Sequence, residues 1–590
     1  MRGSCVETNN YYLKYSHFLI AFIIVAVLYL FFSVSGSLYV YSDNMTVSIV
    51  ASGMYGNHFM CQYIHPLLNV LVRILTPALP SADVFAVLVH VVLFAGVYLM
   101  LLVCEDIFLN AHGRKWELES YIKLVLMILS AVFYCIGMNL WGLNYTVQTA
   151  AVLFSGIVLL SYAMVKSRSW VWIAIGTILM TAGFLIREET VLLFVPFIAL
   201  EVLAGILYKK DYKKQRKIVL KYLAPTIIIG SVILASGKLF WSIEPYASDS
   251  EYNKYRTMVE DYPMSVYSFE KGEQEGIDEA TYEFVRNWGL TDTDRINTET
   301  LKKIASIGGK NQFPYTMAGL ESALKEMKKR VLHMDIHFLV LVIVSLLLTT
   351  WNLLNVKSGW LKAETALAFL GSFLILLYFT FRGRALLRVW QCVFLAFDSV
   401  LVSVLIKDKG YRELNGHTNL EKEKNSTSTM MTSLFMLLIC VILYFSVGQS
   451  IAHTELHLPM SPLTSRMNVD DSAYENTFED DALYIWPNWY LAIPRFFSQQ
   501  NKLPTQRVID HNIAVGDWVY GQVYFRDFLQ NINAENPAKA LVERPNTYIA
   551  AGADESFLKY MRKYYGENLV LRTVGKVADK DICELSATTE

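Results

Sequence analysis

Long runs of apolar residues alternate with short polar connections over the first three quarters of the chain. Each run is close to the about 20 residues that a helix needs to cross the hydrocarbon core of a bilayer. The pattern predicts eleven membrane-spanning helices, at residues 17–40, 84–103, 122–141, 148–164, 170–186, 190–207, 222–242, 335–354, 364–381, 388–406 and 431–450. The first run is too long for a removable signal peptide and lacks a small-residue cleavage site, so we expect it to remain as a membrane anchor.

Lysine and arginine collect in alternate connections, and this bias gives the predicted helices an orientation. The basic connections are residues 112–116, 166–169, 208–221, 356–362 and 407–424. Short loops rich in Lys and Arg face the cytoplasm, so eleven crossings place the N-terminus in the cytoplasm and the C-terminus on the extracytoplasmic side of the membrane. The outer face then receives residues 41–83, 142–147, 187–189, 243–334, 382–388 and 451–590.

Three of these outer segments are long enough to have structure of their own. In the first outer loop, 41–83, the stretches TVSIVASGMYG and IHPLLNVLVRILTPALP are short and apolar, which predicts interfacial or re-entrant helices. The large outer loop, 243–334, is soluble and has a helical pattern in MAGLESALKEMKKRVL. The tail, 451–590, predicts a small extracytoplasmic α/β domain, with strands at ALYIW, LVLRTVGKV and ICEL and a helix at DESFLKYMRKYYGEN. We therefore expect a polytopic α-helical domain over 1–450 followed by this second domain.

Composition supports the membrane class. The 590-residue chain is 54% hydrophobic and 18% charged, whereas soluble domains carry about a quarter charged residues. The net charge of −1 argues against nucleic acid as a partner, because no excess of basic residues is available to neutralise phosphates. The seven cysteines are scattered and lie mostly in apolar runs, which indicates neither a disulfide framework nor a metal site.

Three arginines on the predicted outer face are not explained by the topology. Arg382, Arg384 and Arg388 lie in FRGRALLRVW, although the positive-inside rule places basic residues on the other face. Guanidinium groups bind phosphate through paired hydrogen bonds and keep their charge when partly buried, so the cluster predicts a phosphate site. The alternative is that these side chains reach lipid headgroups or pair with Glu188 and Glu189.

A single acid, Asp43, ends the first apolar run. It is either a solvated residue flanking a membrane helix or the working acid of a membrane enzyme. Asn44 begins an Asn-Met-Thr glycosylation sequon, but sequons occur by chance and this one lies within a few residues of the membrane. His65 follows in the same loop, and without a His/Cys cluster it does not indicate a metal ligand.

Two further polar groups fall on the predicted outer face. The turn LIREE carries Arg187, Glu188 and Glu189, and pairing between these charges is as reasonable an interpretation as chemistry. The soluble loop offers Arg256, Glu260, Asp261 and Tyr262 within YRTMVEDYP. Charged groups at membrane depth are costly and tend to be functional, so both groups are candidates for a site at the mouth of the bundle.

Together these features resemble the GT-C superfamily of integral-membrane glycosyltransferases, particularly its large bacterial branches of uncertain substrate. The resemblance covers residues 17–450 and rests on an acidic motif directly after the first membrane helix, followed by interfacial helices. It is carried by YSDNMTVSIVASGMYG, YIHPLLNVLVRILTPALP, NYTVQTAAVLFSG, FLIREETVLLFVPF and FRGRALLRVW. The chain departs from the pattern at one point, since such proteins often have two adjacent acids where this chain has Asp43 and Asn44.

The resemblance implies an inverting transfer of a sugar from a polyprenyl-phosphate carrier to a glycan, lipid or protein acceptor on the outer face of the membrane. Asp43 would match the catalytic acid and would deprotonate the acceptor hydroxyl while the phosphate leaves. The expected carrier-phosphate ligands are Arg187, Arg382, Arg384 and Arg388. The candidate second acids are Glu188 and Glu189, and the candidate donor or acceptor contacts are Asn44, His65, Asp261 and Tyr262. Participation of a divalent metal, Mg²⁺ or Mn²⁺, stays open.

Two other classes of protein fit the same residues. A transporter, flippase or polysaccharide polymerase that handles lipid-linked sugars would share the outer arginines and the apolar bundle. Transporters tend to have paired halves or helices broken at mid-membrane, and the sequence has neither pattern. A non-catalytic partner in glycan assembly, with a tail that binds glycan, is the remaining alternative.

Overall fold

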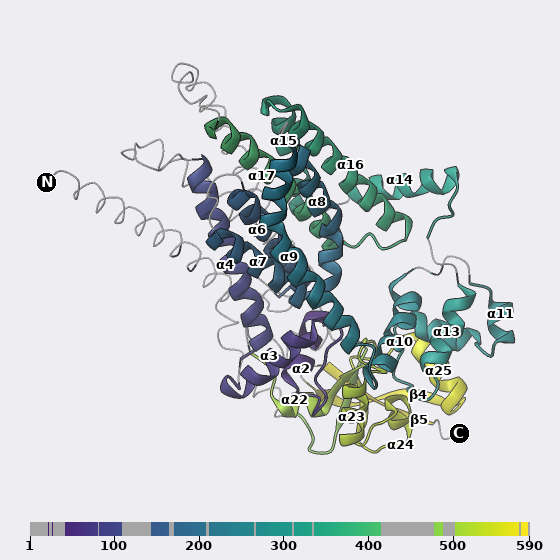
Figure 1. The fold of residues 1–590 in the computed structure, drawn as a ribbon. Coiled ribbons are helices and arrows are strands. Elements are labelled where there is room, and N and C mark those ends of the chain that lie inside the picture. Colours follow the sequence, from purple (N-terminus) through teal and green to yellow (C-terminus); the bar gives the residue numbers. More distant parts are fainter. Residues whose placement is uncertain are drawn as a thin grey trace.

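The computed structural model of the protein describes residues 22, 26, 42–80, 82–108, 143–164, 170–207, 212–262, 264, 267–308, 312–332, 336–414, 477–487, 502–577 and 580–587. A helical bundle makes up one half of the molecule, and a layer of short helices and a sheet lies at one end of it (Figure 1). Apart from residues 22 and 26, the predicted helix 17–40 lies outside the described residues, as do the predicted helices 122–141 and 431–450.

Each of the other eight predicted membrane segments coincides with a helix. These are α4 (Val84–Phe108), α6 (Tyr145–Tyr162), α7 (Trp170–Ile186), α8 (Glu188–Leu207), α9 (Tyr212–Phe240), α15 (Ile336–Asn355), α16 (Gly359–Phe381) and α17 (Leu387–Leu414). Within the described residues, six helices are long and apolar enough to cross a membrane, namely α4, α6, α8, α9, α16 and α17. The apolar parts of α7 and α15 are shorter. The protein is therefore a helical membrane protein, and the total of eleven helices stays a prediction.

Helix α6 occupies the centre of the bundle, because every residue along it is buried. It packs closely against α7 at a pair of glycines. A Cβ atom on Gly156 would lie 2.9 Å from the Met180 side chain, and one on Gly176 would lie 2.9 Å from Leu160. The absence of side chains at these two positions lets the backbones approach, which is a common way for membrane helices to associate.

The first outer loop contains the two predicted short helices, but only one of them lies at a surface. Helix α2 (Ser42–Ser52) is enclosed by protein, with every residue from 44 to 52 buried, so it is not an interfacial helix, and the re-entrant alternative stays a prediction. Helix α3 (Pro66–Leu75) is amphipathic and continues into a 3-10 turn, Thr76–Ala78. It buries Leu68 and Val72 and leaves Leu71 and Ile74 exposed, as an interfacial helix does.

Between α9 and α15 the chain forms a group of helices that lies beside the bundle and above the sheet in Figure 1. They are α10 (Tyr246–Arg256), a π-helical turn (Thr257–Asp261), α11 (Phe269–Gln274), α12 (Glu279–Arg286), α13 (Thr298–Ile307) and α14 (Met317–Leu332). Helix α14 has the bounds that the sequence predicts. Side chains of Asn and Asp cap α12 and α13, because Asp278 and Asn297 accept hydrogen bonds from backbone N–H groups of the first turn.

The C-terminal segment contains a mixed five-stranded sheet with the order β2-β1-β3-β5-β4. The strands are β1 (Leu483–Trp486), β2 (Asn512–Ala514), β3 (Thr547–Ala550), β4 (Leu569–Val577) and β5 (Lys580–Ala587). The helices of this segment are α22 (Gln506–His511), α23 (Val523–Asn531), α24 (Pro537–Glu543) and α25 (Glu555–Tyr565). Strand β1 pairs in parallel with β2 and β3, whereas β5 runs antiparallel to β3 and β4. The predicted strands and helix of the tail therefore match β1, α25, β4 and β5.

The sheet does not have a hydrophobic core of its own. Its buried side chains form one continuous cluster with those of α2, α3 and the helices α10, α12 and α13. Tyr55, from the loop after α2, stacks among Tyr524, Phe525 and Phe528 of α23. Segments from the first outer loop, the large outer loop and the tail thus fold together as one layer. The predicted division at residue 450 stays a prediction.

Parts of several predicted outer segments lie together at one end of the bundle. Residues of 41–83, 142–147, 243–307 and 451–590 share the cluster of the layer, whereas α14 packs against α16 of the bundle. At the other end, the connection after α15 reaches α17, where the Lys357 N–H donates to Asp408 Oδ1 at 3.4 Å. The orientation of the two ends in the membrane stays a prediction.

Asp249 links α10 to the C-terminal layer and provides a test of this packing. The backbone N–H of Val523, at the start of α23, lies 3.0 and 3.1 Å from the two carboxylate oxygens of Asp249, and Arg526 Nη2 lies 3.6 Å from Oδ1. Burial raises the pKa of Asp249 to about 6, although the Val523 N–H and Arg526 favour the charged form. Between about pH 4 and pH 6 the folded protein therefore keeps a proton that the unfolded chain releases, and stability falls as pH rises through that window.

Asp249→Asn removes this titration and keeps an acceptor for the Val523 N–H. We expect the free energy of unfolding of the variant, relative to the wild type, to rise by about 2–3 kcal/mol between pH 4 and pH 7. Unfolding in detergent micelles, followed by tryptophan fluorescence at several pH values, measures this difference. Glu251→Gln, on the exposed side of the same helix, is the control and should show no such trend. An unchanged difference across the window would contradict the buried contact.

Candidate functional site

Asp43 and Arg388 form an ion pair where the bundle meets the layer. Asp43 lies in the first turn of α2, and Arg388 lies in the first turn of α17. Arg388 Nη1 donates to Asp43 Oδ2 at 2.9 Å, and both side chains are partly buried. The structure therefore brings together the candidate acid and one of the candidate phosphate ligands, which are 345 residues apart in the sequence.

The turn between α16 and α17 places the other two arginines of the cluster. Gly383 has φ +75°, a conformation that glycine adopts without steric cost. The Gly383 N–H donates to the carbonyl of Thr380, and the Arg384 N–H donates to that of Phe379, which is the Schellman ending of a helix. Arg382 and Arg384 therefore flank the glycine at the carbonyl end of α16, where positive charge is favoured.

Tyr262 and Asp261 connect these arginines to the large outer loop. The guanidinium carbons of Arg382 and Arg384 lie 4.8 and 5.1 Å from the centre of the Tyr262 ring. Arg384 Nη2 lies 3.1 Å from Asp261 Oδ2. Asp261 and Tyr262 end the π-helical turn after α10, and π-helical turns are frequent at functional sites. Asp261 and Tyr262, two of the loop residues that the sequence singles out, thus contact Arg382 and Arg384 directly.

Arg256 is a fourth arginine in this network and is almost fully buried. Its Nη1 lies 3.2 Å from Glu260 Oε2, and its Nη2 lies 3.7 Å from Asp261 Oδ2. The same Nη2 donates to the hydroxyl of Tyr63 at 2.8 Å, and this hydroxyl donates to Asn253 Oδ1 at 3.1 Å. Burial raises the pKa of Tyr63 to about 12, so its hydroxyl stays protonated and can make both hydrogen bonds.

Arg187 lies at the break between α7 and α8. Its guanidinium carbon is 4.7 Å from the ring centre of Tyr145 and 5.4 Å from that of Tyr63, and Nη1 also donates to the Tyr145 hydroxyl. Burial opposes its charge, but the two tyrosines, Glu189 and Asp43 together raise the pKa of Arg187, so it stays protonated. Tyr63 therefore contacts Arg187 with its ring and Arg256 with its hydroxyl.

These contacts define one cluster, which we call the arginine cluster. It consists of Asp43, Tyr63, Tyr145, Arg187, Arg256, Asp261, Tyr262, Arg382, Arg384 and Arg388. Five guanidinium groups face two carboxylates in this set, and the further carboxylate of Glu260 is buried against Arg256. The excess of positive charge among fixed hydrogen-bond donors is suited to binding an anion such as a phosphate.

The other candidate residues have structural roles or lie at the margin of the cluster. Asn44 is buried and donates to the carbonyl of Leu143, so it is not a glycan acceptor in this fold. His65 caps α3 by accepting the Leu67 N–H, and its Nε2 lies 2.9 Å from the Ile233 carbonyl. Glu189 is more than half exposed and lies 3.7 Å from Arg187 Nε.

Glu188 begins α8 and is partly buried. A Cβ atom added to Gly237 of α9 would lie 3.0 Å from the His65 ring and 3.9 Å from Glu188 Oε2. Glu188 therefore points towards α9 and His65. The structure thus joins seven of the eleven candidate residues, the four arginines with Asp43, Asp261 and Tyr262, and places Glu189 beside them.

A divalent metal does not fit the donors around Asp43. Its carboxylate faces a guanidinium, and the neighbouring Asn44 amide turns away to a backbone carbonyl. Across the part of the chain that the structure describes, no group of three or more His, Cys, Asp or Glu side chains is arranged to hold a metal ion. Mg²⁺ and Mn²⁺ sites in proteins are built from several oxygen ligands.

Tyr63 and Tyr145 are members of the cluster that were not among the candidates. Arg256, in contrast, is one of the charged residues that the sequence singles out in YRTMVEDYP. The tyrosines give no such signal, because the chain has 35 tyrosines and most bury their rings in cores. Comparison with family models, curated proteins and solved structures finds no match to this chain.

Arg256 provides a test of the buried part of the cluster. Arg256→Met removes the counter-charge of Glu260, whose pKa is about 8 because burial disfavours the carboxylate even beside Arg256. At pH 9 we expect the variant to lose about 3–5 kcal/mol of unfolding free energy, as when one partner of a buried ion pair is removed. The loss should be smaller at pH 6, because the folded variant then keeps Glu260 protonated.

The matched variants are Glu260→Gln added to Arg256→Met, and Lys254→Met on the exposed side of α10. The double variant should recover stability at pH 9, since no buried charge is left unpaired. Lys254→Met should change the unfolding free energy by no more than about 0.5 kcal/mol. Equal stability of Arg256→Met and the wild type at pH 9 would contradict the buried pair.

Proposed function

We propose that the protein is a membrane glycosyltransferase that transfers a sugar from a polyprenyl-phosphate carrier to a hydroxyl-bearing acceptor. The observation that supports this most directly is the contact of Asp43 with Arg388 inside a cluster of five arginines. A carboxylate that can accept a proton and a set of cations that can hold a phosphate are the two parts that such a reaction needs.

In the proposed reaction the acceptor oxygen attacks the anomeric carbon of the sugar and gives its proton to Asp43. The bond between the anomeric carbon and the phosphate oxygen breaks, and the electron pair stays on the phosphate. The phosphodiester thereby becomes a phosphate monoester with greater negative charge. Cations that bind this developing charge more strongly than the starting charge lower the barrier, and we assign this role to Arg384 and Arg388, whose guanidinium groups contact Asp261 and Asp43.

Asp43 and the carrier phosphate would compete for Arg388. In the structure the guanidinium of Arg388 is engaged by the Asp43 carboxylate. A phosphate bound to Arg388 would draw the guanidinium away from Asp43, and a carboxylate that loses its cationic partner is a better proton acceptor. The base would then be released only when the donor is bound, which would limit unproductive proton uptake.

A membrane arrangement belongs to this proposed reaction. The arginine cluster and the C-terminal layer would lie on the extracytoplasmic face, with eleven helices, the N-terminus in the cytoplasm and the tail outside. The exposed apolar side of α3, with Leu67, Leu71 and Ile74, would lie in the interface of that leaflet. The acceptor would reach Asp43 from the outer side of the layer.

Asp43→Asn tests the catalytic role. We expect kcat to fall about 10²–10⁴-fold, the usual contribution of a general base, without an increase in KM for the carrier. The assay uses the protein in lipid nanodiscs with a panel of polyprenyl-phosphate sugars, and folding is checked by thermal unfolding.

Glu189→Gln is the matched control, because this acid contacts Arg187 from the exposed side of the cluster. Its activity should stay within about twofold of the wild type, since exposed ion pairs contribute little. Full activity of Asp43→Asn would remove Asp43 from the mechanism. Turnover of no sugar on the panel by the wild-type protein would contradict the proposed function itself.

A further inference from the structure

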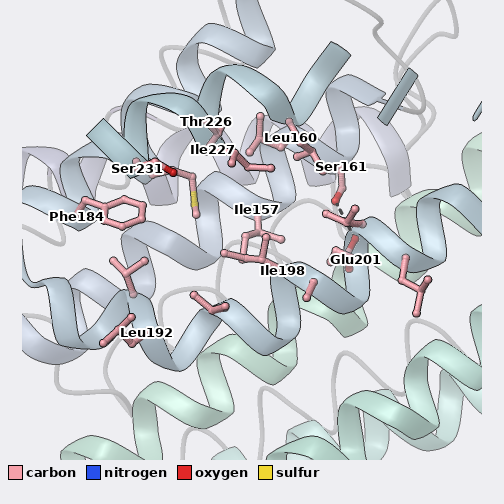
Figure 2. A pocket seen from close by; sticks show the side chains of 18 of the residues that line it. Ile157, Leu160, Ser161, Phe184, Leu192, Ile198, Glu201, Thr226, Ile227 and Ser231 are labelled. Atoms are coloured by element: carbon pink, nitrogen blue, oxygen red, sulfur yellow. Dashed lines mark hydrogen bonds between the residues drawn. The ribbon is translucent and has the colours of Figure 1, made fainter. Parts of the chain in front are cut away.

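Helix α14 exposes large apolar side chains, although it belongs to the large outer loop. Such exposure is expected on α8 and α9, which are long and apolar enough to cross a membrane. Their residues Leu192 and Ile227, at the apolar cavity in Figure 2, are more than half exposed. In and just before α14, Tyr315 is 77%, Met317 81% and Leu332 69% exposed. Apolar residues that gather on a surface in this way mark a contact with a membrane or a partner.

Two contacts hold α14 at the end of α16. The Tyr315 ring, just before α14, stacks on Phe381, the last residue of α16, with 5.2 Å between the ring centres. Near the other end of α14, Arg330 Nη1 donates to the carbonyl of Ala385, in the turn after α16, at 2.8 Å. Figure 1 shows α14 beside α16 on the outside of the bundle. Because both contacts are made at the same end of α16, α14 lies across the bundle at one depth.

The chain after α14 indicates the same depth. Helix α15, which coincides with a predicted membrane segment, begins at Ile336, four residues after α14 ends at Leu332. Met327 and Val331 of α14 pack against the core of the bundle. A chain that leaves α16 and enters α15 at this end passes between the hydrocarbon and the head groups here. Helix α14 therefore lies at the level of the head groups, with its axis near the membrane plane.

Two neighbouring rows of residues along α14 are exposed over their whole length. Residues four apart on a helix lie on the same side, one turn above the other. One row consists of Leu324, Lys328 and Leu332, and the next row consists of Glu321, Lys325 and Lys329. Lysines beside exposed leucines can lay their stems along the apolar surface and place the ammonium groups among lipid head groups.

The charge of α14 is complementary to an anionic head group. The helix has four cations against two acids, so its net charge is +2. The acids pair within the helix, since Lys325 Nζ lies 2.7 Å from Glu321 Oε1 and Arg330 Nε lies 3.0 Å from Glu326 Oε1. The four cations are close to the start of α15, in a segment that is predicted to lie outside, so the positive-inside rule does not explain them. Basic clusters beside a membrane helix are typical of binding to anionic lipids.

We propose that α14 is an interfacial helix that binds the phosphodiester head groups of anionic phospholipids through Lys325, Lys328 and Lys329. Leu324 and Leu332 lie in the adjoining acyl region. The proposal does not depend on glycosyl transfer, and it concerns whichever leaflet lies at this end of the bundle. A free phosphate ion would meet the same lysines but would gain nothing from the leucines.

Photo-crosslinking in nanodiscs tests this surface on the full-length protein. Phosphatidylglycerol and phosphatidylcholine probes carry the same diazirine in one acyl chain and differ only in the head group. Peptide mass spectrometry separates labels on α14 from labels on the turn between α16 and α17, which belongs to the arginine cluster. The phosphatidylglycerol probe should label α14 about tenfold more than the phosphatidylcholine probe at low ionic strength. High ionic strength should reduce this ratio, and inorganic phosphate should reduce it no more than chloride of equal ionic strength.

Two pairs of substitutions separate the head group from the chain. Lys325→Gln with Lys328→Gln should lower the preference for phosphatidylglycerol about fivefold to tenfold. Leu324→Gln with Leu332→Gln should reduce the labelling of α14 by both probes. All four residues are exposed, so the unfolding temperature should stay close to that of the wild type.

Lys302→Gln with Lys303→Gln is the matched control, because it removes the same charge from the exposed side of α13 in the same loop. It should leave the preference for phosphatidylglycerol unchanged. Equal labelling of α14 by the two probes at low ionic strength would overturn the proposal, as would labels confined to the turn between α16 and α17. Nanodiscs that hold two copies of the protein, and that the α14 lysine pair alone prevents, would make α14 an interface with a second copy instead.

Discussion

Five guanidinium groups meet where the bundle joins the C-terminal layer, and none of them can lose its charge at physiological pH. Each must therefore find an anion, an aromatic ring or a carbonyl. Asp43 and Asp261 supply anions, the buried carboxyl of Glu260 accepts a hydrogen bond from Arg256, and Tyr63, Tyr145 and Tyr262 supply the rings. These partners come from the first outer loop, α6 and the turn after α10, so satisfying the arginines ties together segments that are hundreds of residues apart.

The permanent charge of these five arginines also makes the cluster suited to binding a further anion. Arg388 is held by Asp43 and Arg384 by Asp261, whereas Arg256, deeper in the protein, is shared by Glu260 and Asp261. The buried contacts position the cluster, and the partly exposed ones can be exchanged for a ligand. In the other half of the bundle, one cation, Lys407, is shared by two buried acids, Glu201 and Glu364.

Much of this arrangement could be predicted from the sequence, because hydrophobic length and charge bias are local signals. The eight described helices that coincide with predicted membrane segments, α14 and the strands β1, β4 and β5 all lie where the pattern places them. The burial of α2 could not be predicted, since TVSIVASGMYG is equally apolar in a membrane surface and in a protein core. The role of Tyr63 could not be predicted either. It depends on Arg187, which follows α7, and on Arg256 of α10, and both contact this one side chain. The roles of Asn44 and His65 were missed for the same reason, because their partners, Leu143 and Ile233, are distant in the sequence.

The central claim is that Asp43 and the carrier phosphate compete for Arg388, and binding of polyprenyl phosphate to Asp43→Asn tests it most directly. The affinity of radiolabelled polyprenyl phosphate for the protein in nanodiscs is measured for the wild type, for this variant and for Glu189→Gln. If the two anions compete, Asp43→Asn binds the phosphate about threefold to tenfold more tightly than the wild type, because a nearby negative charge is gone. Weaker binding by Asp43→Asn would mean that Asp43 only holds Arg388 in place, and would contradict the account.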